Sequence, residues 1–286
     1  MIRTLPRSRL YTVAFKSYII AYFLFLFAPL GITCVLAFNE SQVPSLPWKG
    51  FTLDWFFADG PERIGIFHDS INLDSIWVSF RVAFFVAILS TTVGTLGAFL
   101  FEQEEFRFKG ALYFLMLAPL VVPGVILGIS ILLFSNTLGL LFEERWSIDV
   151  ALFRPGFWLV VLGQFSFITT FVTLVVSARL RKFDRTLEEA ALNLGANRFE
   201  VIWHITLKFL RPAILASAAV AFLMSFENFN TTLFLVGSEA TLPINLYLQV
   251  RDGSTPVINA ISFLLILGTS SIALVNLYFS RGPEGR

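Results

Sequence analysis

A polar stretch interrupts the apolar chain between Thr186 and Pro212, where the sequence reads TLEEAALNLGANRFEVIWHITLKFLRP. Long apolar runs precede and follow it. The 286-residue chain is 56% hydrophobic and 14% charged, with a mean hydropathy of +0.75. Because soluble globular domains carry about 25% charged residues, this composition indicates a polytopic membrane protein. The polar stretch is therefore expected to lie in water beside the membrane.

Two helix-start signals stand within this stretch. Thr186 and Glu189 have the spacing of a capping box, in which side chains bond to the free amides of a helix's first turn, and Asn197 and Glu200 repeat that spacing. Between the two signals, Gly195 can end a helix in a left-handed turn at little steric cost. The stretch therefore predicts a helix, a sharp turn and a second helix.

Six apolar runs reach the length of about 20 residues that a membrane-spanning helix needs. They cover residues 15–38, 75–101, 111–136, 156–178, 212–236 and 257–280. These runs are too long and too continuously apolar for the alternating strands of a membrane barrel. We therefore predict an all-α fold with six transmembrane helices, forming one transmembrane domain over residues 1–286. Pro119, Pro123 and Gly124 are expected to break the third helix.

Lysine and arginine placement predicts the orientation of these helices. Fifteen of these residues fall in the termini and in the loops on the same side, whereas five fall on the opposite side. Cytoplasmic segments carry the excess of positive charge, so both termini and residues 179–211 are predicted to be cytoplasmic. Arg81 falls inside the second run and is expected to reach the interface, where Asp74 or a lipid phosphate would pair with it.

Residues 39–74 form a long loop on the outer side, rich in aromatic and acidic residues. Two interpretations stay open for it. The loop can be an interfacial aromatic belt with a solvated acidic rim, or a docking surface for a soluble partner outside the membrane.

The motifs of enzymes are missing from the chain. It has no Gly-x-x-x-x-Gly-Lys phosphate loop and no His-Glu-x-x-His motif, and its two histidines and single Cys34 give no metal cluster. We therefore expect no catalytic residue, no metal, no cofactor and no nucleic-acid partner. A membrane protein without chemistry of its own, but with a structured cytoplasmic segment, suggests a transport pathway whose energy comes from another protein.

The polar stretch resembles the EAA loop of bacterial ABC importer permeases. The resemblance lies in Glu189-Ala190-Ala191, followed at the family's spacing by Gly195 and by Ile205-Thr206-Leu207. The family's pattern ends in Leu-Pro, whereas Lys208 follows Leu207 here. Residues 118–123 (APLVVP) and 177–195 are similar to the polyamine-type subgroup. Residues 242–247 (LPINLY), followed by Asn259-Ala260, resemble the second permease subunit of spermidine/putrescine importers.

This resemblance implies a type I ABC importer permease fold in the bacterial inner membrane. The implied partners are a second permease subunit of different sequence, two ATP-binding subunits that hydrolyse the ATP, a periplasmic substrate-binding protein and the lipid bilayer. Residues 39–74 would be a periplasmic loop and residues 179–211 a cytoplasmic coupling loop. The residues implied to contact an ATPase groove are Glu188, Glu189, Ala190, Ala191, Leu194, Gly195 and Ala196. The alternative for this loop is an amphipathic hairpin on the membrane surface.

The fifth apolar run carries a candidate solute site in residues 225–232, SFENFNTT. On a continuous helix, Glu227, Asn228, Thr231 and Thr232 would gather on one side. A charged side chain near the bilayer centre costs about 2.5–3.5 kcal/mol and usually faces a bundle interior or a wet cavity. Glu227 is therefore either a hydrogen-bonded structural residue or a carboxylate that attracts a cationic solute.

On the second interpretation, the pathway residues are Phe226, Glu227, Asn228, Phe229 and Thr231. The two phenylalanines would supply cation–π contacts. Polyamine permeases tend to have two neighbouring acidic residues here, and Asn228 replaces the second one. The expected solute is therefore small and cationic, such as a polyamine, with other amino-group-bearing or neutral solutes left open.

A stand-alone secondary transporter or channel, with the cytoplasmic loop as a regulatory element, is the alternative function. Ion-coupled carriers usually place several ionisable groups near the membrane midplane. Glu227 is nearly alone in the apolar runs, which favours the importer subunit.

Overall fold

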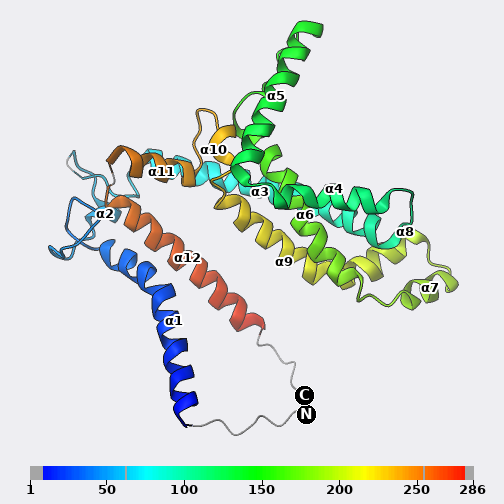
Figure 1. Ribbon diagram of the computed structural model, residues 1–286, viewed down its shortest axis with the longest axis horizontal. Coiled ribbons are helices and arrows are strands. Elements are labelled where there is room, and N and C mark those ends of the chain that lie inside the picture. The colour runs from blue at the N-terminus through cyan, green and yellow to red at the C-terminus, as the bar shows by residue number, and fades with distance from the viewer. Residues whose placement is uncertain (1–8, 62, 254, 281–286) are drawn as a thin grey trace. The chain divides into compact units, whose positions relative to one another are not determined.

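The computed structural model describes residues 9–61, 63–253 and 255–280, and these residues are mostly helical (Figure 1). No β-strand occurs among them, and only two isolated bridges join Asn39 to Phe51 and Asp59 to Ile64. The predicted all-α fold class is thereby confirmed. The main helices are α1 (Arg9–Leu36), α2 (Asp54–Phe57), α3 (Ser70–Gln103), α4 (Lys109–Val121), α5 (Gly124–Trp146), α6 (Phe157–Leu180), α7 (Thr186–Asn193), α8 (Arg198–Val201), α9 (Leu207–Phe226), α10 (Thr232–Leu235), α11 (Leu242–Gly253) and α12 (Val257–Ser280).

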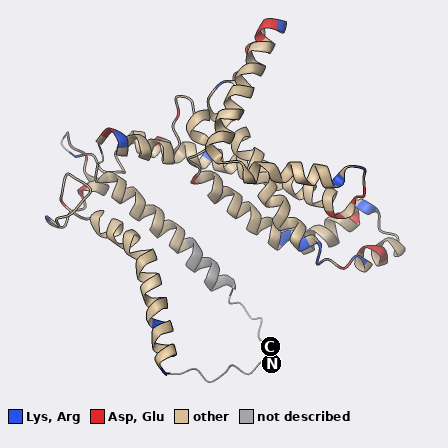
Figure 2. Cartoon of the chain, in the orientation of Figure 1, with Lys and Arg blue, Asp and Glu red and all other residues tan. Residues whose placement is uncertain are grey.

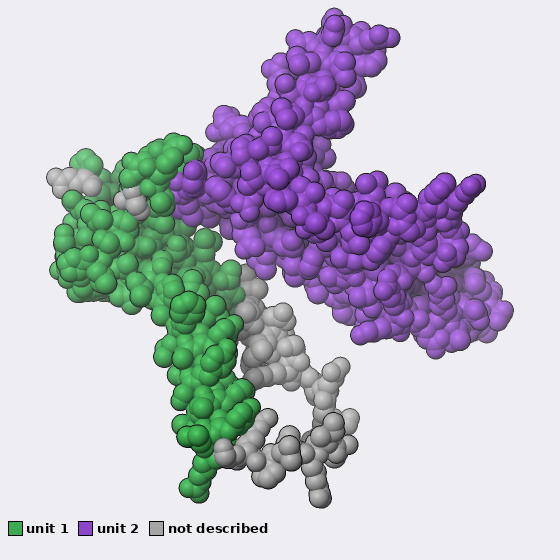
Figure 3. All heavy atoms as spheres, viewed as in Figure 1, with its two compact units in different colours: residues 1–73, 248–286 green, residues 74–247 purple. Residues whose placement is uncertain are grey.

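The chain divides into two compact units (Figure 3). Unit 1 contains residues 1–73 and 248–286, and unit 2 contains residues 74–247. The single transmembrane domain expected over residues 1–286 stays a prediction. The two termini, whose side of the membrane was predicted from charge, belong to residues 1–8 and 281–286, outside the described residues.

In unit 1, α1 packs along α12, and α2 contacts α12. An aromatic cluster holds these elements together, because Phe38 and Phe56 both lie edge-on to Phe263, with ring centroids 5.0 and 5.9 Å apart. The Trp55 indole donates to the backbone oxygen of Asn39 at 2.8 Å. The outer loop is therefore folded onto the helix ends rather than extended.

The predicted loop of residues 39–74 ends earlier than expected. Helix α3 begins at Ser70, because the Asp69 carboxylate accepts a hydrogen bond from the backbone amide of Asn72 at 3.1 Å. This bond satisfies a free amide of the helix's first turn. Asp74 therefore lies within α3, not in the loop.

In unit 2, α6 is the central helix. It packs along α9 and also contacts α4 and α10. Val160, Ile168 and Val172 of α6 are fully buried, together with Val86 of α3 and Leu210 of α9. Large apolar side chains on the outer faces of these helices stay exposed, as expected of helices that contact lipid. Figure 2 shows charged residues of this unit around α7, around the turn between α3 and α4 and at one end of α5.

Among the described residues, five helices are long and apolar enough to cross a membrane: Arg9–Leu36, Ser70–Gln103, Gly124–Trp146, Phe157–Leu180 and Arg198–Phe226. Two shorter apolar helices are Lys109–Val121 and Val257–Ser271. The predicted break of the third run is confirmed, since α4 ends at Val121 and Pro123 precedes the first residue of α5.

The continuous helix predicted over residues 212–236 is wrong at both ends. The helix already begins at Arg198 and passes through a π-helical turn, η2 (Ile202–Thr206), into α9. It ends at Phe226, and residues 227–231 separate it from α10. No proline or glycine lies in this break. Side chains of other helices hold it open, as described below.

Of the two partners predicted for Arg81, Asp74 is wrong. Its guanidinium lies 3.0 Å from the Glu239 carboxylate and 5.5 Å from the centre of the Phe157 ring. Glu239 comes from the segment between α10 and α11, far away in the sequence. Asp74, about two helical turns before Arg81, was the nearest acid in the sequence and is not its partner.

Candidate functional site

The first helix of the polar stretch, α7, is capped by a different residue from the one predicted. The carboxylate of Asp184 accepts hydrogen bonds from the Thr186 amide at 3.0 Å and from the Thr186 hydroxyl at 2.8 Å. Both bonds lower the pKa of Asp184 below its usual value, and the bond from the hydroxyl is the larger cause. Because Thr186 is already the first helical residue, its side chain does not cap the helix. The predicted box of Thr186 and Glu189 is therefore wrong.

The turn after α7 confirms the role predicted for Gly195. Its φ is +92°, in the left-handed region. The Ala196 amide donates to the Ala191 oxygen at 3.1 Å, and the Gly195 amide donates to the Leu192 oxygen at 3.0 Å. This pair of bonds defines a Schellman motif, which closes the last turn of a helix. Glycine suits this position because a side chain would be strained at this φ.

The capping box at Asn197 is confirmed. The Asn197 side chain accepts from the Glu200 amide, and the Glu200 carboxylate accepts from the Asn197 amide, each at 2.9 Å. The helix that begins here is not a separate short one, since α8, η2 and α9 follow each other without a gap. The chain has Lys208 where the EAA pattern has proline, so the helix continues with an intact backbone donor.

Two sets of polar contacts fix α7 to the bases of α9 and α3. The hydroxyl of Thr206, which is 0% exposed, donates to the carboxylate of Glu188. On the other side, the Glu102 carboxylate pairs with Arg181 at 2.8 Å and its backbone oxygen accepts from Arg185 at 2.7 Å. Glu102 raises the pKa of Arg181 through this hydrogen bond and its charge. Glu188 of α7 is therefore bonded to the base of the α9 helix, and the segment that leads from α6 into α7 is bonded to the end of α3.

The predicted coupling residues lie together on this fixed unit. Glu189, Ala190, Leu194 and Gly195 are exposed, whereas Glu188, Ala191 and Ala196 are half-buried against the second helix. The Leu194 side chain is 89% exposed, and Leu187 is 51% exposed. An exposed apolar surface of this kind on an otherwise polar segment is typical of a site that another protein covers.

The predicted pathway residues are distributed differently from the expectation, because the helix that was to carry them ends at Phe226. Glu227 is exposed, Asn228 and Phe229 are half-buried, and Thr231 is buried. The ring of Phe229 lies 5.0 Å from that of Tyr247. The gathering of Glu227 with Asn228, Thr231 and Thr232 on one helix face is therefore wrong, and only Glu227 among these four is freely presented.

Gln164 of α6 holds the break in place and was missed by the sequence analysis. Its side chain is 0% exposed. It donates to the Thr232 hydroxyl at 2.8 Å and accepts from the Ser225 hydroxyl, so it bridges the two sides of the break. The Thr232 hydroxyl in turn donates to the Asn228 amide oxygen at 2.9 Å. The sequence did contain a signal for this site, because Gln164 is a strongly polar residue in the middle of the apolar run 156–178.

The break in the third run lies against the break after α9. A Cβ atom on Gly128 would lie 2.7 Å from the Thr231 oxygen, and one on Gly124 would lie 3.0 Å from the Asn230 Cβ. A cavity of about 280 Å³ opens between the two breaks, lined by Pro119, Leu120, Val122, Gly124, Leu127, Phe167, Met224, Asn228, Asn230 and Thr231. Irregular backbone at membrane depth is tolerated where it is buried in protein or lines a cavity, and both conditions hold here.

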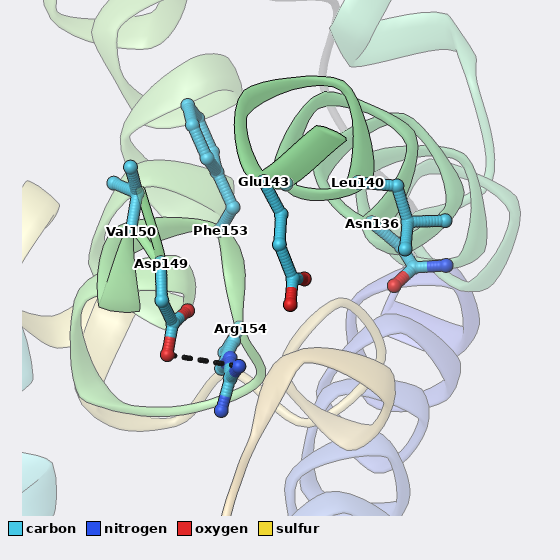
Figure 4. A pocket seen from close by; sticks show the side chains of 8 residues that line it. Asn136, Leu140, Glu143, Asp149, Val150, Phe153 and Arg154 are labelled. Carbon is cyan, nitrogen blue, oxygen red and sulfur yellow. Dashed lines mark ion pairs between the residues drawn. The ribbon is translucent and has the colours of Figure 1, made fainter. Parts of the chain in front are cut away.

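A second hollow of about 200 Å³ lies where α5 approaches its connection to α6 (Figure 4). Glu143 extends from α5 toward it, and the ion pair of Asp149 and Arg154, 2.9 Å long, forms its opposite wall. The sequence analysis did not single out these residues. All three side chains are exposed, so they form a polar surface rather than an enclosed site.

Comparison with known proteins identifies the family. Residues 90–281 match the family described as "binding-protein-dependent transport system inner membrane component". The chain belongs to this family. It is 31% identical to the "putrescine transport system permease protein PotI" of Escherichia coli K12, over 92% of this chain and 89% of that protein. It is 28% identical to the "spermidine/putrescine transport system permease protein PotC" of Haemophilus influenzae, over 92% and 93%.

A solved structure shows the same fold. A chain in the crystal structure of a bacterial ABC transporter involved in the import of the acidic polysaccharide alginate matches with a TM-score of 0.69. The two chains are 14% identical, and the match covers 98% of this chain and 99% of that one. Family membership and fold therefore agree with the resemblance found in the EAA loop. The chain is an inner-membrane transport component, and its relatives are permease subunits rather than enzymes.

Proposed function

We propose that the chain forms half of the translocation pathway of an ATP-driven importer for a polyamine or a similar small cationic solute. A periplasmic binding protein delivers the solute. The observation that carries this proposal is the rigidly anchored α7 unit with its exposed apolar surface, in a chain whose relatives are named for putrescine and spermidine transport. The family's dependence on a binding protein supports the assembly, and it disfavours a stand-alone transporter or channel.

The proposed topology has six transmembrane helices with both termini in the cytoplasm. In support, the charge distribution puts fifteen lysines and arginines on one side and five on the other. Helices α4 and α5 together supply the third span. Helix α12, with 24 residues, is long enough for the sixth. The complete importer needs a second permease subunit, of different sequence, and two ATP-binding subunits.

The proposed coupling surface is made of Glu188, Glu189, Ala190, Ala191, Leu194, Gly195 and Ala196 of the cytoplasmic segment 179–211. An ATPase subunit that closes on ATP would push this surface, and the bonds of Glu188 to Thr206 and of Arg181 to Glu102 would carry the motion into α9 and α3. The differential contact of the ATPase with two permease states is what shifts the equilibrium between them.

For the solute, we propose a pathway that passes Phe226, Glu227, Asn228, Phe229 and Thr231 at the break after α9. Glu227 is exposed, and its carboxylate has no hydrogen-bond or ion-pair partner among the described residues. A free carboxylate beside two phenylalanine rings suits a solute with ammonium groups. The polar side chains of Asn228 and Thr231 lie next to it and line the cavity between the two helix breaks.

Uptake measurements test this function. The Glu227→Gln importer should take up putrescine with a KM about fivefold higher, because one attraction of about 1 kcal/mol between charges is lost. Glu144→Gln is the matched control, since Glu144 is also exposed and makes no described contact. Equal effects of both variants would remove Glu227 from the pathway.

A cysteine at Ala190 should crosslink to an ATP-binding subunit in native membranes, and failure of that crosslink would contradict the coupling surface.

A further inference from the structure

A groove runs along the first half of α9, next to the face that packs on α6. It has a volume of about 570 Å³ and is lined by Trp203, His204, Leu207, Lys208, Arg211, Ile214 and Leu215. The lining includes two permanent cations and a histidine but no acidic side chain. Trp203 and Leu215, at its two ends, are 59% and 60% exposed.

The two cations of the groove have no partner in the part of the chain that the structure describes. Neither the Lys208 nor the Arg211 side chain makes an ion pair, a hydrogen bond or a ring contact there. Other cations near the base of this unit are used internally: Arg181 pairs with Glu102, and Arg179 lies over the ring of Phe209 at 4.1 Å. The groove therefore offers two uncompensated positive charges beside an apolar wall.

The position of the groove along the helix corresponds to the membrane boundary. Lys208 and Arg211 are the last charged residues of α9, and no charge follows from Pro212 to Phe226. In a helix that crosses the inner membrane, such cations extend toward the phosphate level. Trp203 lies on the polar side of them, as tryptophans of the interface do. Leu215 lies on the side of the hydrocarbon.

We propose that this groove binds one anionic phospholipid. Its phosphate would lie between Lys208 and Arg211, and an acyl chain would follow Ile214 and Leu215. The negative headgroups of the membrane surface attract such basic clusters, whereas a protein partner would have to supply two acids at the phosphate level. Lys208 stands where the EAA pattern has proline, so the pattern itself does not supply this cation.

The bound lipid would hold the base of the helix that carries the coupling unit. Lys208 follows Thr206 by two residues, and Thr206 bonds to Glu188 of α7. A headgroup held at Lys208 would therefore fix the end of α9 at which the motion of α7 enters the membrane. The proposal concerns lipid binding and does not depend on the identity of the solute.

Native mass spectrometry of the complete importer, purified from membranes, tests the site with phosphatidylglycerol and phosphatidylcholine as probes. The intact complex should bind phosphatidylglycerol more tightly than phosphatidylcholine. Lys208→Gln with Arg211→Gln should weaken phosphatidylglycerol binding about tenfold or more. Lys182→Gln with Arg145→Gln, which removes two other unpaired exposed cations, should leave the affinity unchanged. Lys208→Arg should retain it.

Fluorescence provides a second readout in the same complex. Brominated phosphatidylglycerol in vesicles should quench the emission of Trp203, so the quenched fraction should fall in Trp203→Phe. Equal lipid affinities in the two double variants, or equal binding of both lipids by the intact protein, would overturn the proposal. So would efficient crosslinking of a cysteine at Leu215 to another subunit, because a protein would then cover the groove. Displacement by glycerol phosphate as effectively as by the lipid would assign the site to a free phosphate instead.

Discussion

The chain contains two helix breaks that differ in where they lie and in what holds them. The polar turn, residues 194–197, separates α7 from α8 outside the apolar spans. The span break, residues 227–231, separates α9 from α10. In the polar turn, Gly195 and Asn197 satisfy the free backbone groups within a few residues. In the span break, the side chain of Asn228 accepts locally from the Thr232 amide at 3.2 Å. The side chains on the two sides of the break are joined by Gln164, which is 61 residues from Ser225 in the sequence.

This difference follows from the surroundings of the two breaks. In water, backbone groups that lose their helical partners can bond to solvent, so a break needs only a suitable glycine and a cap. In the membrane, an unpaired backbone or side-chain group costs several kcal/mol. A break there survives only where packed helices supply partners and room. Gly124 and Gly128 supply the room, because Cβ atoms there would collide with Asn230 and Thr231.

The largest effect is expected for the span break. Replacing Gln164 by Leu leaves the buried hydroxyl of Ser225 without its acceptor and removes the donor to the Thr232 hydroxyl, which keeps only its bond to Asn228. Each buried group left unsatisfied costs about 1–3 kcal/mol, so the assembled importer should lose about 3 kcal/mol of stability. The measurement is the apparent melting temperature of the purified complex, together with putrescine uptake at a temperature where both proteins stay folded.

Ser166→Ala is the matched control for Gln164. The Ser166 hydroxyl donates to the Gly163 oxygen of its own helix at 2.7 Å and is exposed. Its loss should lower stability by about 0.5–1.5 kcal/mol at most. If Gln164→Leu melts at the same temperature as this control, the span break does not depend on the α6 side chain, and the comparison between the two breaks fails.

A smaller effect on stability, but a specific one on transport, is expected for the polar turn. Gly195→Val forces a β-branched residue to a φ of +92°, at a cost of about 1–3 kcal/mol. No atom lies within 4 Å of the added Cβ, so the strain is relieved locally by opening the turn. Putrescine uptake should fall at least tenfold while the complex still assembles and hydrolyses ATP.

Gly110→Val controls for the bulk of the added side chain. Gly110 also has open space around it, but it lies in α4 and its φ is not in the left-handed region. This variant should retain most of the uptake. Normal uptake by Gly195→Val, with hydrolysis still coupled to it, would show that the shape of the polar turn does not matter for transport.

The sequence predictions were accurate where a feature depends on neighbouring residues and failed in most places where it depends on residues distant in the sequence. The turn at Gly195, the box of Asn197 with Glu200 and the break at Pro123 depend on neighbouring residues and are confirmed. The end of α9 at Phe226 was not predicted from its own segment, and Gln164, which bridges the two sides of the break, lies on another helix. The ion pair of Arg81 with Glu239 joins residues separated by 158 positions, and a local search found the wrong acid for the same reason.

One local prediction also failed, because two residues near the start of the same helix are both able to cap it. Asp184 and Thr186 can both cap a helix, and the spacing to Glu189 favoured Thr186. A carboxylate that accepts from both the amide and the hydroxyl of Thr186 is the stronger acceptor. The helix therefore begins at Thr186 itself. The roles of the coupling and pathway residues depend on partner chains and a solute, and they stay predictions.

The smallest effect separates the confirmed cap from the failed one. Asn197→Ala removes a side chain that bonds to the Glu200 amide at 2.9 Å, which should cost about 1 kcal/mol locally. Thr186→Ala removes no bond to the free amides of α7. Hydrogen exchange of the intact complex should therefore speed up about fivefold at the Glu200 amide in the first variant. In the second variant, the amides of residues 187–189 should exchange at nearly the original rate, because the Asp184 carboxylate still accepts from the amide of residue 186. Faster exchange in the Thr186→Ala protein would restore Thr186 as the cap and leave the start of α7 governed by the local pattern after all.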